Sequence, residues 1–400
     1  MFVNALSAQC ARFGLDAELV LVEWNPPADK PRLADAITWP APNGRLSVRI
    51  LEVPAERHLK LAHGDRLPLF QMIAKNVGIR RARAPFVVAT NVDVLFDDAL
   101  MAVLAARRLR PGTLYRADRH DTAAVLDPDA PVEQLLAGAS ANLIRICRLE
   151  GTYDVCTGEF FQIYGPLTQL PGPLARWSRL VSFAVPLSAV YVRQGTRRVR
   201  RRLRRWHLAR TTGSGTLARL TDGIEPMHVL AAVGKQLRQL ARTVREQNET
   251  LATMWLHEKA RVRVHSNACG DFTLLSRTDW ERVGGYAEYE MFSLHIDSLF
   301  LYEAHYAGLG QRVLPGAVYH LEHGMGFKPD EESLRSLTER IESAAIPQIS
   351  NEQFMEWIIE MHRRRAPMRP NAGKGWGFVG ETFAETDPYR SEQPRLEVVT

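Results

Sequence analysis

FVVATNVDVLF, from Phe86 to Phe96, is the stretch that decides the fold of this chain. Its first five residues form a short apolar run of strand length directly after Pro85. Asn91 and Asp93 follow at once. In an open α/β sheet, ligands bind in the crevice beyond the carboxyl ends of the strands. The segment therefore predicts a buried strand with a ligand site at its end.

The sequence around this strand alternates between helical and strand patterns. Apolar residues recur on one helical face near the N-terminus and again before Pro85, and two short apolar runs between them have strand length. Asp97 and Asp98 then begin another helix, where acidic residues favour the helix dipole, so we interpret both as structural. The alternation predicts an α/β protein with a mixed sheet flanked by helices. The predicted elements are helices over 2–13, 69–82 and 97–108 and strands over 18–24, 46–53 and 86–90.

Charge and composition indicate which binding partners and which cellular compartment to expect. The 400 residues carry a net charge of +6, which favours anionic partners such as nucleotides or phospholipid surfaces. The four cysteines form no CxxC pair, so neither a zinc knuckle nor a disulfide framework is indicated. Residues 1–15 lack the basic start and apolar run of a secretory signal. We therefore expect a cytoplasmic protein.

The alternation is lost from 127 to 257, which predicts a mainly helical, basic insertion. Residues 180–192 are apolar but include Pro186, and they are shorter than the roughly 20 residues that a membrane-spanning helix needs. Residues 197–210 contain eight arginines in fourteen positions. Together, 180–210 fit a segment that lies on an anionic membrane, while a solvated basic face or a loop remains the alternative. Nucleic acid is disfavoured because no aromatic residues interleave with the arginines to stack on bases.

Regular elements return after the insertion, with a helix after His295 and a strand over 311–319. That strand runs into two histidines, His320 and His323, whose spacing allows them to share one metal ion. If only one is a ligand, we prefer His323, which lies closer to the following glycine. Glu322 could instead orient one of these histidines by accepting a hydrogen bond from its ring, without binding the metal itself.

Asp93 is the strongest single candidate for chemistry. A carboxylate directly after a buried strand can reach a divalent ion that also binds the two phosphates of a nucleotide, and Mn²⁺ or Mg²⁺ suits oxygen and imidazole ligands. The alternative is an Asx turn that closes the strand.

Asp297 lies among apolar residues at the start of the next helix, where a half-buried carboxylate could act as a general base. His295 is the alternate base, and the other role for Asp297 is a helix N-cap. Gly270 and Asp271 fit a loop that a sugar approaches closely, although glycine there could equally serve turn geometry.

Taken together, these motifs resemble the GT-A glycosyltransferases of the family 2 type. Asn91-Val92-Asp93 stands in place of the usual Asp-x-Asp. GDFTLLSRTDWERVGGYAEYEMFSLHIDSLF, residues 270–300, resembles a galactosyltransferase-type signature, and VYHLEH, residues 318–323, resembles the segment that carries the terminal metal histidine. The resemblance covers about 1–124 and 260–330.

The resemblance implies a Rossmann-like GT-A domain and a role for each candidate residue. Mn²⁺ or Mg²⁺ would be held by Asp93 with His323 or His320, and Asn91 and Asp93 would bind the nucleotide-diphosphate sugar. Gly270 and Asp271 would contact the acceptor, a glycan or lipid-linked glycan hydroxyl. Asp297 would be the base of an inverting transfer. The implied divisions are a nucleotide-sugar half (1–126), the insertion (127–257), an acceptor and metal half (258–330) and a helical C-terminal tail with a glycine-rich segment (331–400).

Two departures from the family pattern keep other functions open. Asn91 replaces the first aspartate, and the strand that normally opens such folds is missing from the sequence. A degenerate, non-catalytic protein that binds a sugar nucleotide or a membrane and scaffolds partners is therefore one alternative. The other is a metal-dependent hydrolase in which the candidate aspartates and histidines activate a water molecule.

Overall fold

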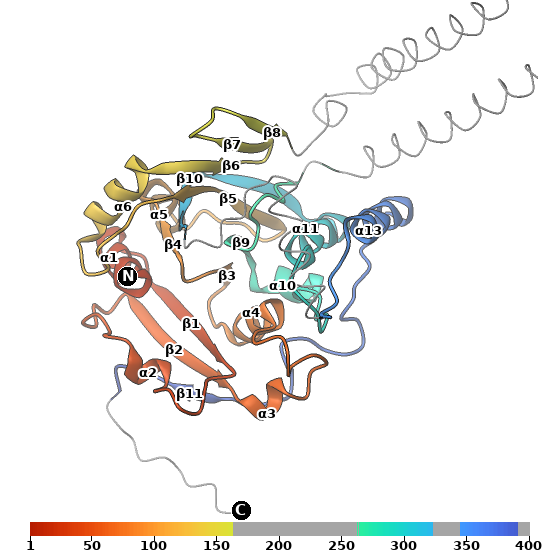
Figure 1. Ribbon diagram of the computed structural model, residues 1–400, viewed down its shortest axis with the longest axis horizontal. Helices are drawn as coiled ribbons and strands as arrows, with labels where there is room; N and C mark the ends of the chain where they lie inside the picture. The colour runs from red at the N-terminus through yellow and green to blue at the C-terminus, as the bar shows by residue number, and fades with distance from the viewer. Residues whose placement is uncertain (163–261, 263, 323–344, 391–400) are drawn as a thin grey trace, which may run out of the picture. The chain divides into compact units, whose positions relative to one another are not determined.

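The computed structural model describes residues 1–162, 262, 264–322 and 345–390 (Figure 1). These residues belong to one compact unit, which the chain leaves after 163 and rejoins at 262. The predicted membrane-docking segment 180–210, most of the remaining insertion, His323 and residues 331–344 of the tail lie outside the described residues. None of the described helices is both long and apolar enough to span a bilayer.

A small sheet forms from the N-terminal part of the chain. Helix α1 (Phe2–Phe13) leads into strand β1 (Ala17–Trp24), which pairs in parallel with β2 (Leu46–Val53). Strand β11 (Ala384–Thr386) adds to the other edge of β2 in antiparallel fashion. The helix and the two strands predicted here are confirmed. Two short helices, α2 (Leu33–Ala36) and α3 (Ala55–His58), lie in the connections.

The second sheet has eight strands and is mixed. Its main path runs in the order β3-β9-β5-β6-β7-β8, and β10 pairs in parallel with β5 and antiparallel with β4. This arrangement confirms a mixed α/β sheet, and it includes the predicted strand 86–90 as β3. The strands are β3 (Phe86–Thr90), β4 (Val94–Phe96), β5 (Thr113–Thr122), β6 (Leu143–Cys147), β7 (Gly151–Asp154), β8 (Phe160–Gln162), β9 (Phe272–Ser276) and β10 (Gly310–Leu321).

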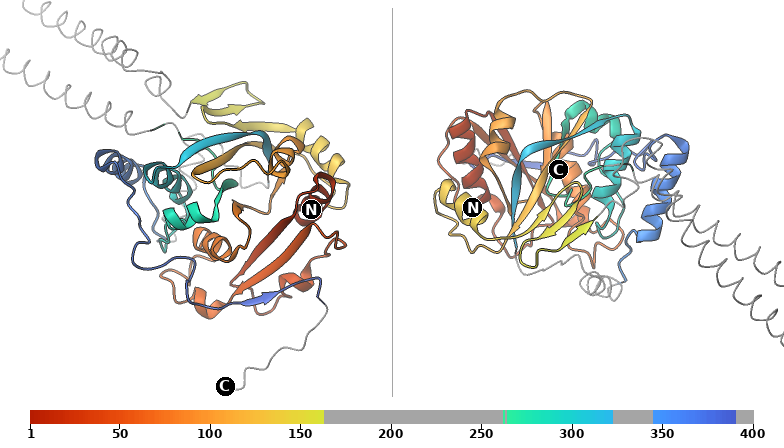
Figure 2. Two further views of the ribbon diagram at one scale, coloured as in Figure 1. Left: turned by 180° about the vertical axis from the view of Figure 1, so that it is seen from behind. Right: turned by 90° about the horizontal axis from the view of Figure 1, so that it is seen from above.

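Helices flank the sheets. Asp97 caps α5 by accepting a hydrogen bond from the Leu100 backbone at 2.7 Å, and it also accepts one from Ala317 at 2.8 Å, so its structural interpretation is confirmed. Helices α11 and α13 pack against each other (Figure 2). The longer helices are α4 (Gln71–Arg81), α5 (Asp98–Ala105), α6 (Val132–Ala141), α10 (Arg277–Val283), α11 (Ile296–Tyr306) and α13 (Asn351–Arg364).

Residues 127–162 differ from the predicted helical insertion, because strands β6 to β8 follow α6 and extend the large sheet. These strands have only three to five residues, and β6 carries a buried charge, Arg145, which interrupts the apolar pattern that would reveal a strand. An ion pair with Asp121 makes that burial possible.

The C-terminal tail is helical only in part. After α13 the chain passes through the glycine-rich segment to β11. The segment packs behind α4: a Cβ at Gly377 would lie 2.6 Å from the Asn76 carbonyl oxygen, and one at Gly285 would lie 2.6 Å from the Trp376 ring. β11 carries no periodicity that a sequence could reveal, and ion pairs of Glu385 with Arg49 and Arg83 anchor it.

The two sheets do not join into one. Among the described strands, β1 pairs only with β2, and β3 pairs only with β9. Helix α4 contacts both β1 and β3, and one apolar cluster contains residues of both sheets.

Candidate functional site

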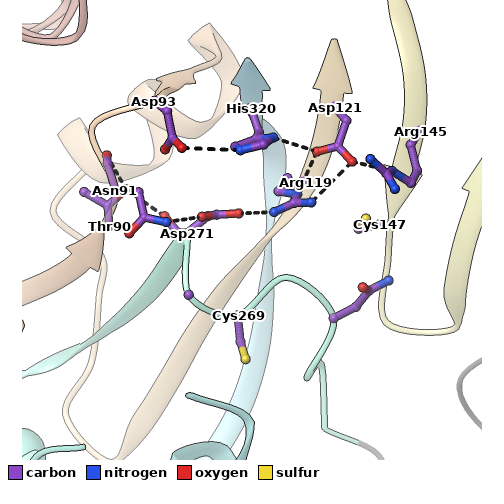
Figure 3. Close-up of polar contacts among 12 residues, drawn as sticks. Thr90, Asn91, Asp93, Arg119, Asp121, Arg145, Cys147, Cys269, Asp271 and His320 are labelled. Carbon is purple, nitrogen blue, oxygen red and sulfur yellow. Dashed lines mark hydrogen bonds and ion pairs between the residues drawn. The ribbon is translucent and has the colours of Figure 1, made fainter. Parts of the chain in front are cut away.

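Polar residues from three separate segments meet where β3 ends (Figure 3). Asn91 and Asp93 occupy the turn between β3 and β4. Asp271 directly precedes β9, whose first residue pairs with Thr90 at the end of β3. His320 lies on β10 opposite Val94. The sheet topology therefore brings Asn91, Asp93, Asp271 and His320 together, as their predicted roles require.

Asp271 fixes one side of this cluster. Its Oδ1 accepts a hydrogen bond from the Asn91 side chain at 2.6 Å, and its Oδ2 lies 2.7 Å from Arg119. The Thr90 hydroxyl donates to its backbone carbonyl at 2.7 Å. Only 4% of Asp271 is exposed. Both carboxylate oxygens are thus engaged within the protein, so an acceptor hydroxyl would have to share them.

His320 links two aspartates. Its Nε2 lies 3.4 Å from Asp93 Oδ2, and its Nδ1 lies 3.1 Å from Asp121 Oδ1. Burial opposes protonation of the ring, but the hydrogen bonds to Asp121 and Asp93 outweigh it and raise the pKa of His320 to about 9. The ring therefore carries a proton at neutral pH, and any metal ion that binds it must displace that proton.

Three charged residues that the sequence interpretation missed complete this network. Asp121 is fully buried and accepts hydrogen bonds from Arg145 Nε at 2.6 Å and from Arg119 Nη2 at 3.3 Å. Arg119 Nε also lies 2.8 Å from Asp121 Oδ1 as an ion pair. Burial alone would raise the pKa of Asp121, but the bond from His320 and the two guanidinium groups lower it to about 2. The sequence did contain an indication of this pair. Arg119 and Asp121 are two residues apart on one strand, so both side chains project to the same face of the sheet.

Lys75 on α4 was also missed. Its Nζ donates to the Gly270 carbonyl at 2.6 Å. Burial lowers the pKa of Lys75, while the carboxylates of Asp271 and Asp297 oppose that shift. A Cβ built on Gly270 would lie 3.2 Å from Asp297 Oδ2 and 3.9 Å from Lys75 Nζ. Because Gly270 has no side chain, the Asp297 carboxylate and the Lys75 amine can both lie close to it.

Asp297 is the second residue of α11 and is half-buried, with Oδ1 accepting from the Ser298 backbone at 2.7 Å. The N-cap position is held by His295, not Asp297. The His295 ring stacks on Phe354 with centroids 4.6 Å apart, and its Nε2 lies 2.8 Å from Asn351 Oδ1. Its hydrogen-bond and ring contacts are therefore with α13, which leaves Asp297 as the better placed of the two predicted bases.

A fully buried arginine, Arg116, holds the loop that precedes Asp271. Its guanidinium donates to the carbonyls of His265 (3.0 Å), Asn267 (3.0 Å) and Cys269 (3.3 Å). Backbone carbonyls in a folded core need donors, and this one side chain supplies them to three residues. Arg116 thereby sets the position from which Gly270 and Asp271 enter the site.

The donor set matches part of a metal site. Asp93, in the turn between β3 and β4, and His320, on β10, offer a carboxylate and an imidazole that face each other. The contact between His320 Nδ1 and Asp121 is the carboxylate–histidine arrangement that orients metal-binding imidazoles. No group of three or more potential ligands occurs within the ranges that the structure describes, and His323 lies beyond them. Asp93 and His320 thus fit as two ligands of a divalent ion.

We predict that His265, which anchors the same loop, makes stability depend on pH. The ring is fully buried, and burial lowers its pKa, although the contact with Asp118 at 3.0 Å opposes the shift. The unfolded chain therefore binds a proton below about pH 6.5 more readily than the folded one, and stability falls as pH drops through that value. Urea titrations at pH 7.0 and 5.5 should show a smaller loss for His265→Gln than for wild type, by at most about 1.4 kcal/mol per pH unit. Parallel profiles for the two proteins would contradict this.

Comparisons with known proteins add nothing to this geometry. No protein-family model, curated protein or solved structure matches the chain. Any function assigned to it therefore rests on the residues of the site themselves.

Proposed function

We propose that this protein is a glycosyltransferase that moves a sugar from a nucleotide-diphosphate sugar to a hydroxyl of a glycan or lipid-linked glycan. One observation carries the proposal. Asn91 with Asp93, Gly270 with Asp271, Asp297, and His320 come from distant parts of the sequence and are gathered about the end of β3. This grouping fits the roles that the resemblance to GT-A transferases implies for them.

The assignment of the GT-A fold to this domain is part of the same proposal. A site beyond the carboxyl end of a sheet strand, in a mixed sheet flanked by helices, is what a GT-A domain would require. No described strand joins β1 to β3.

Asp93 and His320 would hold Mn²⁺ or Mg²⁺, with Asp121 fixing the orientation of the imidazole. When bound, the ion would neutralise charge on the departing diphosphate. Lys75 adds a positive charge close to Asp297 and Gly270. Asn91 contributes hydrogen bonds rather than charge, since its amide bridges Gln71 and Asp271.

In the proposed reaction, Asp297 takes the proton from the acceptor hydroxyl as that oxygen attacks the anomeric carbon. The bond from this carbon to the diphosphate oxygen breaks in the same step, and the nucleoside diphosphate leaves. A single displacement of this kind inverts the configuration at the anomeric carbon. A Cβ on Gly270 would lie 3.2 Å from Asp297 Oδ2, so glycine at this position keeps the proposed base from being crowded by a side chain.

The proposed location is the cytoplasmic face of a membrane, where a lipid-linked acceptor would be presented. The support is compositional, from the apolar and arginine-rich residues of 180–210.

We expect calorimetric titration with UDP and GDP to detect binding of one of them that depends on Mn²⁺ and is lost in Asp93→Ala. The reason is that Asp93 supplies one of the two ligands facing each other at the site. Asp98→Ala, which removes an exposed carboxylate at the start of α5, is the matched control and should bind as wild type does.

The other outcomes separate the alternatives. If folded wild-type protein binds neither nucleotide with or without Mn²⁺, the transferase proposal fails and the non-catalytic scaffold takes its place. Binding that Asp93→Ala leaves intact would remove the metal role from this residue. Release of products from simple esters without any nucleotide sugar would favour the hydrolase.

A further inference from the structure

A cavity of about 1090 Å³ lies between the facing edges of the two sheets. Its walls are β1 and β3, neither of which has a second partner strand among the described residues (Figure 1). Its lining is predominantly apolar.

The cavity follows the backbone edges of these strands. Successive side chains of a strand point to opposite faces of a sheet, so a cavity beside one face would be lined by alternate residues only. Here every residue from 17 to 23 and every residue from 85 to 91 lines it. The unused backbone N–H and C=O groups of both strands therefore face the cavity, and such groups require partners when they are buried.

The two edges run in the same direction. Near their starts, the Arg83 backbone, just before β3, donates to Glu18 on β1 at 2.9 Å. Near their ends, Trp24 of β1 packs on Phe70, and the adjacent Gln71 donates to Asn91 at 3.2 Å. β1 and β3 are thus parallel to each other. This is the arrangement expected if a third strand, parallel to both, lay between them.

Helices close the other two sides of the cavity. α4 lines one side with small residues, including Ala74 and Gly78. On the other side lie Phe2 and Leu6 of α1 and Met101 of α5. A segment placed here would be covered on both faces, which is the setting of a parallel strand with a continuous apolar sequence.

We propose that this cavity is a slot for one extended apolar segment, joined to the amino end of α1 and running parallel to β1 and β3. We place the segment ahead of α1 because of the way in which a parallel strand has to be connected to β1. A parallel neighbour of β1 must reach it through a crossover, usually a helix, and α1 directly precedes β1 and contributes Phe2 and Leu6 to the slot. With the segment in place, the two sheets become one.

The segment would also extend the polar site. Gln71, Lys75, Asn91 and Asp93 line the slot, so the carboxyl end of the segment would emerge beside them. Its last residues would then share the crevice with a bound ligand. This inference does not rest on the transferase proposal, because it uses only the strand edges and the cavity.

The test adds the segment and measures hydrogen exchange. A Val/Ile-rich extension of about seven residues, which spans about 23 Å, is placed ahead of Met1 through a short Gly/Ser linker. The matched control carries proline at the central position, which removes a donor and is not tolerated in an inner strand. In the 400-residue chain we expect fast exchange for the amides of β1 and β3 that do not bond to β2 or β9. The extension should slow them about tenfold or more and raise the unfolding temperature by about 5 °C or more, and the proline control should do neither.

Three results would overturn the proposal. Slow exchange along both edges in the 400-residue chain would mean that other residues of the chain fill the slot. Equal effects of the extension and its proline control would mean that no strand pairs there. Protection by the same sequence added as a free peptide, without protection by the extension, would assign the slot to a segment of a partner protein. None of these readouts involves nucleotide binding, so failure here is distinct from failure of the proposed function.

Discussion

Arg116→Met is expected to lower the free energy of unfolding by about 4 kcal/mol, measured by urea denaturation at pH 7. The backbone carbonyls of His265 and Asn267 lose their donor, while that of Cys269 keeps the bond from the Thr273 hydroxyl at 2.8 Å. Each unsatisfied buried group costs about 1–3 kcal/mol. The loss is a large fraction of the roughly 5–15 kcal/mol that stabilises a typical protein.

The matched control is Arg108→Met, which removes an exposed arginine and should change stability by no more than about 0.5 kcal/mol. Arg116→Lys keeps the charge but cannot reach three carbonyls in the same geometry, so it should lose about half as much as Arg116→Met. A loss below about 1 kcal/mol in Arg116→Met would show that other contacts hold the 265–269 loop.

Asp297→Asn should reduce turnover by about 10²- to 10⁴-fold, the range typical of a lost general base. The measurement is the release of nucleoside diphosphate from a panel of nucleotide sugars in the presence of Mn²⁺ and acceptor glycans. Asparagine preserves the shape of the side chain and its contact with the Ser298 backbone, so nucleotide affinity should change by less than about twofold.

Asp98→Asn serves as the control, because Asp98 also lies in the first turn of a helix but away from the site. Its turnover should match that of wild type. If Asp297→Asn keeps full turnover while Asp98→Asn does too, another group accepts the proton. If it loses turnover and nucleotide affinity together, Asp297 acts in binding instead.

The elements with strong periodicity could be predicted from the sequence. Helix α1, strands β1, β2 and β3, and helices α4, α5 and α11 all lie within a few residues of their predicted positions. The apolar residues of each element repeat at the period of that helix or strand and are buried in the fold, so local pattern and tertiary burial agree. Strands β6 to β8 and β11 could not be found this way, because each is only three to five residues long. β11 depends in addition on β2, a partner distant in the sequence.

The site was predictable where a polar residue interrupts an apolar segment. Asp93 at a strand end and Asp297 at a helix start stand out for that reason, and the structure confirms the strand and the helix beside them. Arg119, Asp121, Arg145 and Lys75 were missed, because their contacts depend on which strands and helices become neighbours in the fold. Asp121 faces Arg145 only through the antiparallel pairing of β5 with β6.

The pairing of β11 with β2 has a consequence for the order of folding. Arg49 and Glu385 form their ion pair across a separation of 336 residues. Contacts between such remote residues form late, since closing a long loop costs chain entropy before any bond offsets it. During synthesis, the edge of β2 therefore stays exposed until nearly the whole chain has left the ribosome. In that interval, this edge of β2 is open to pairing with another chain.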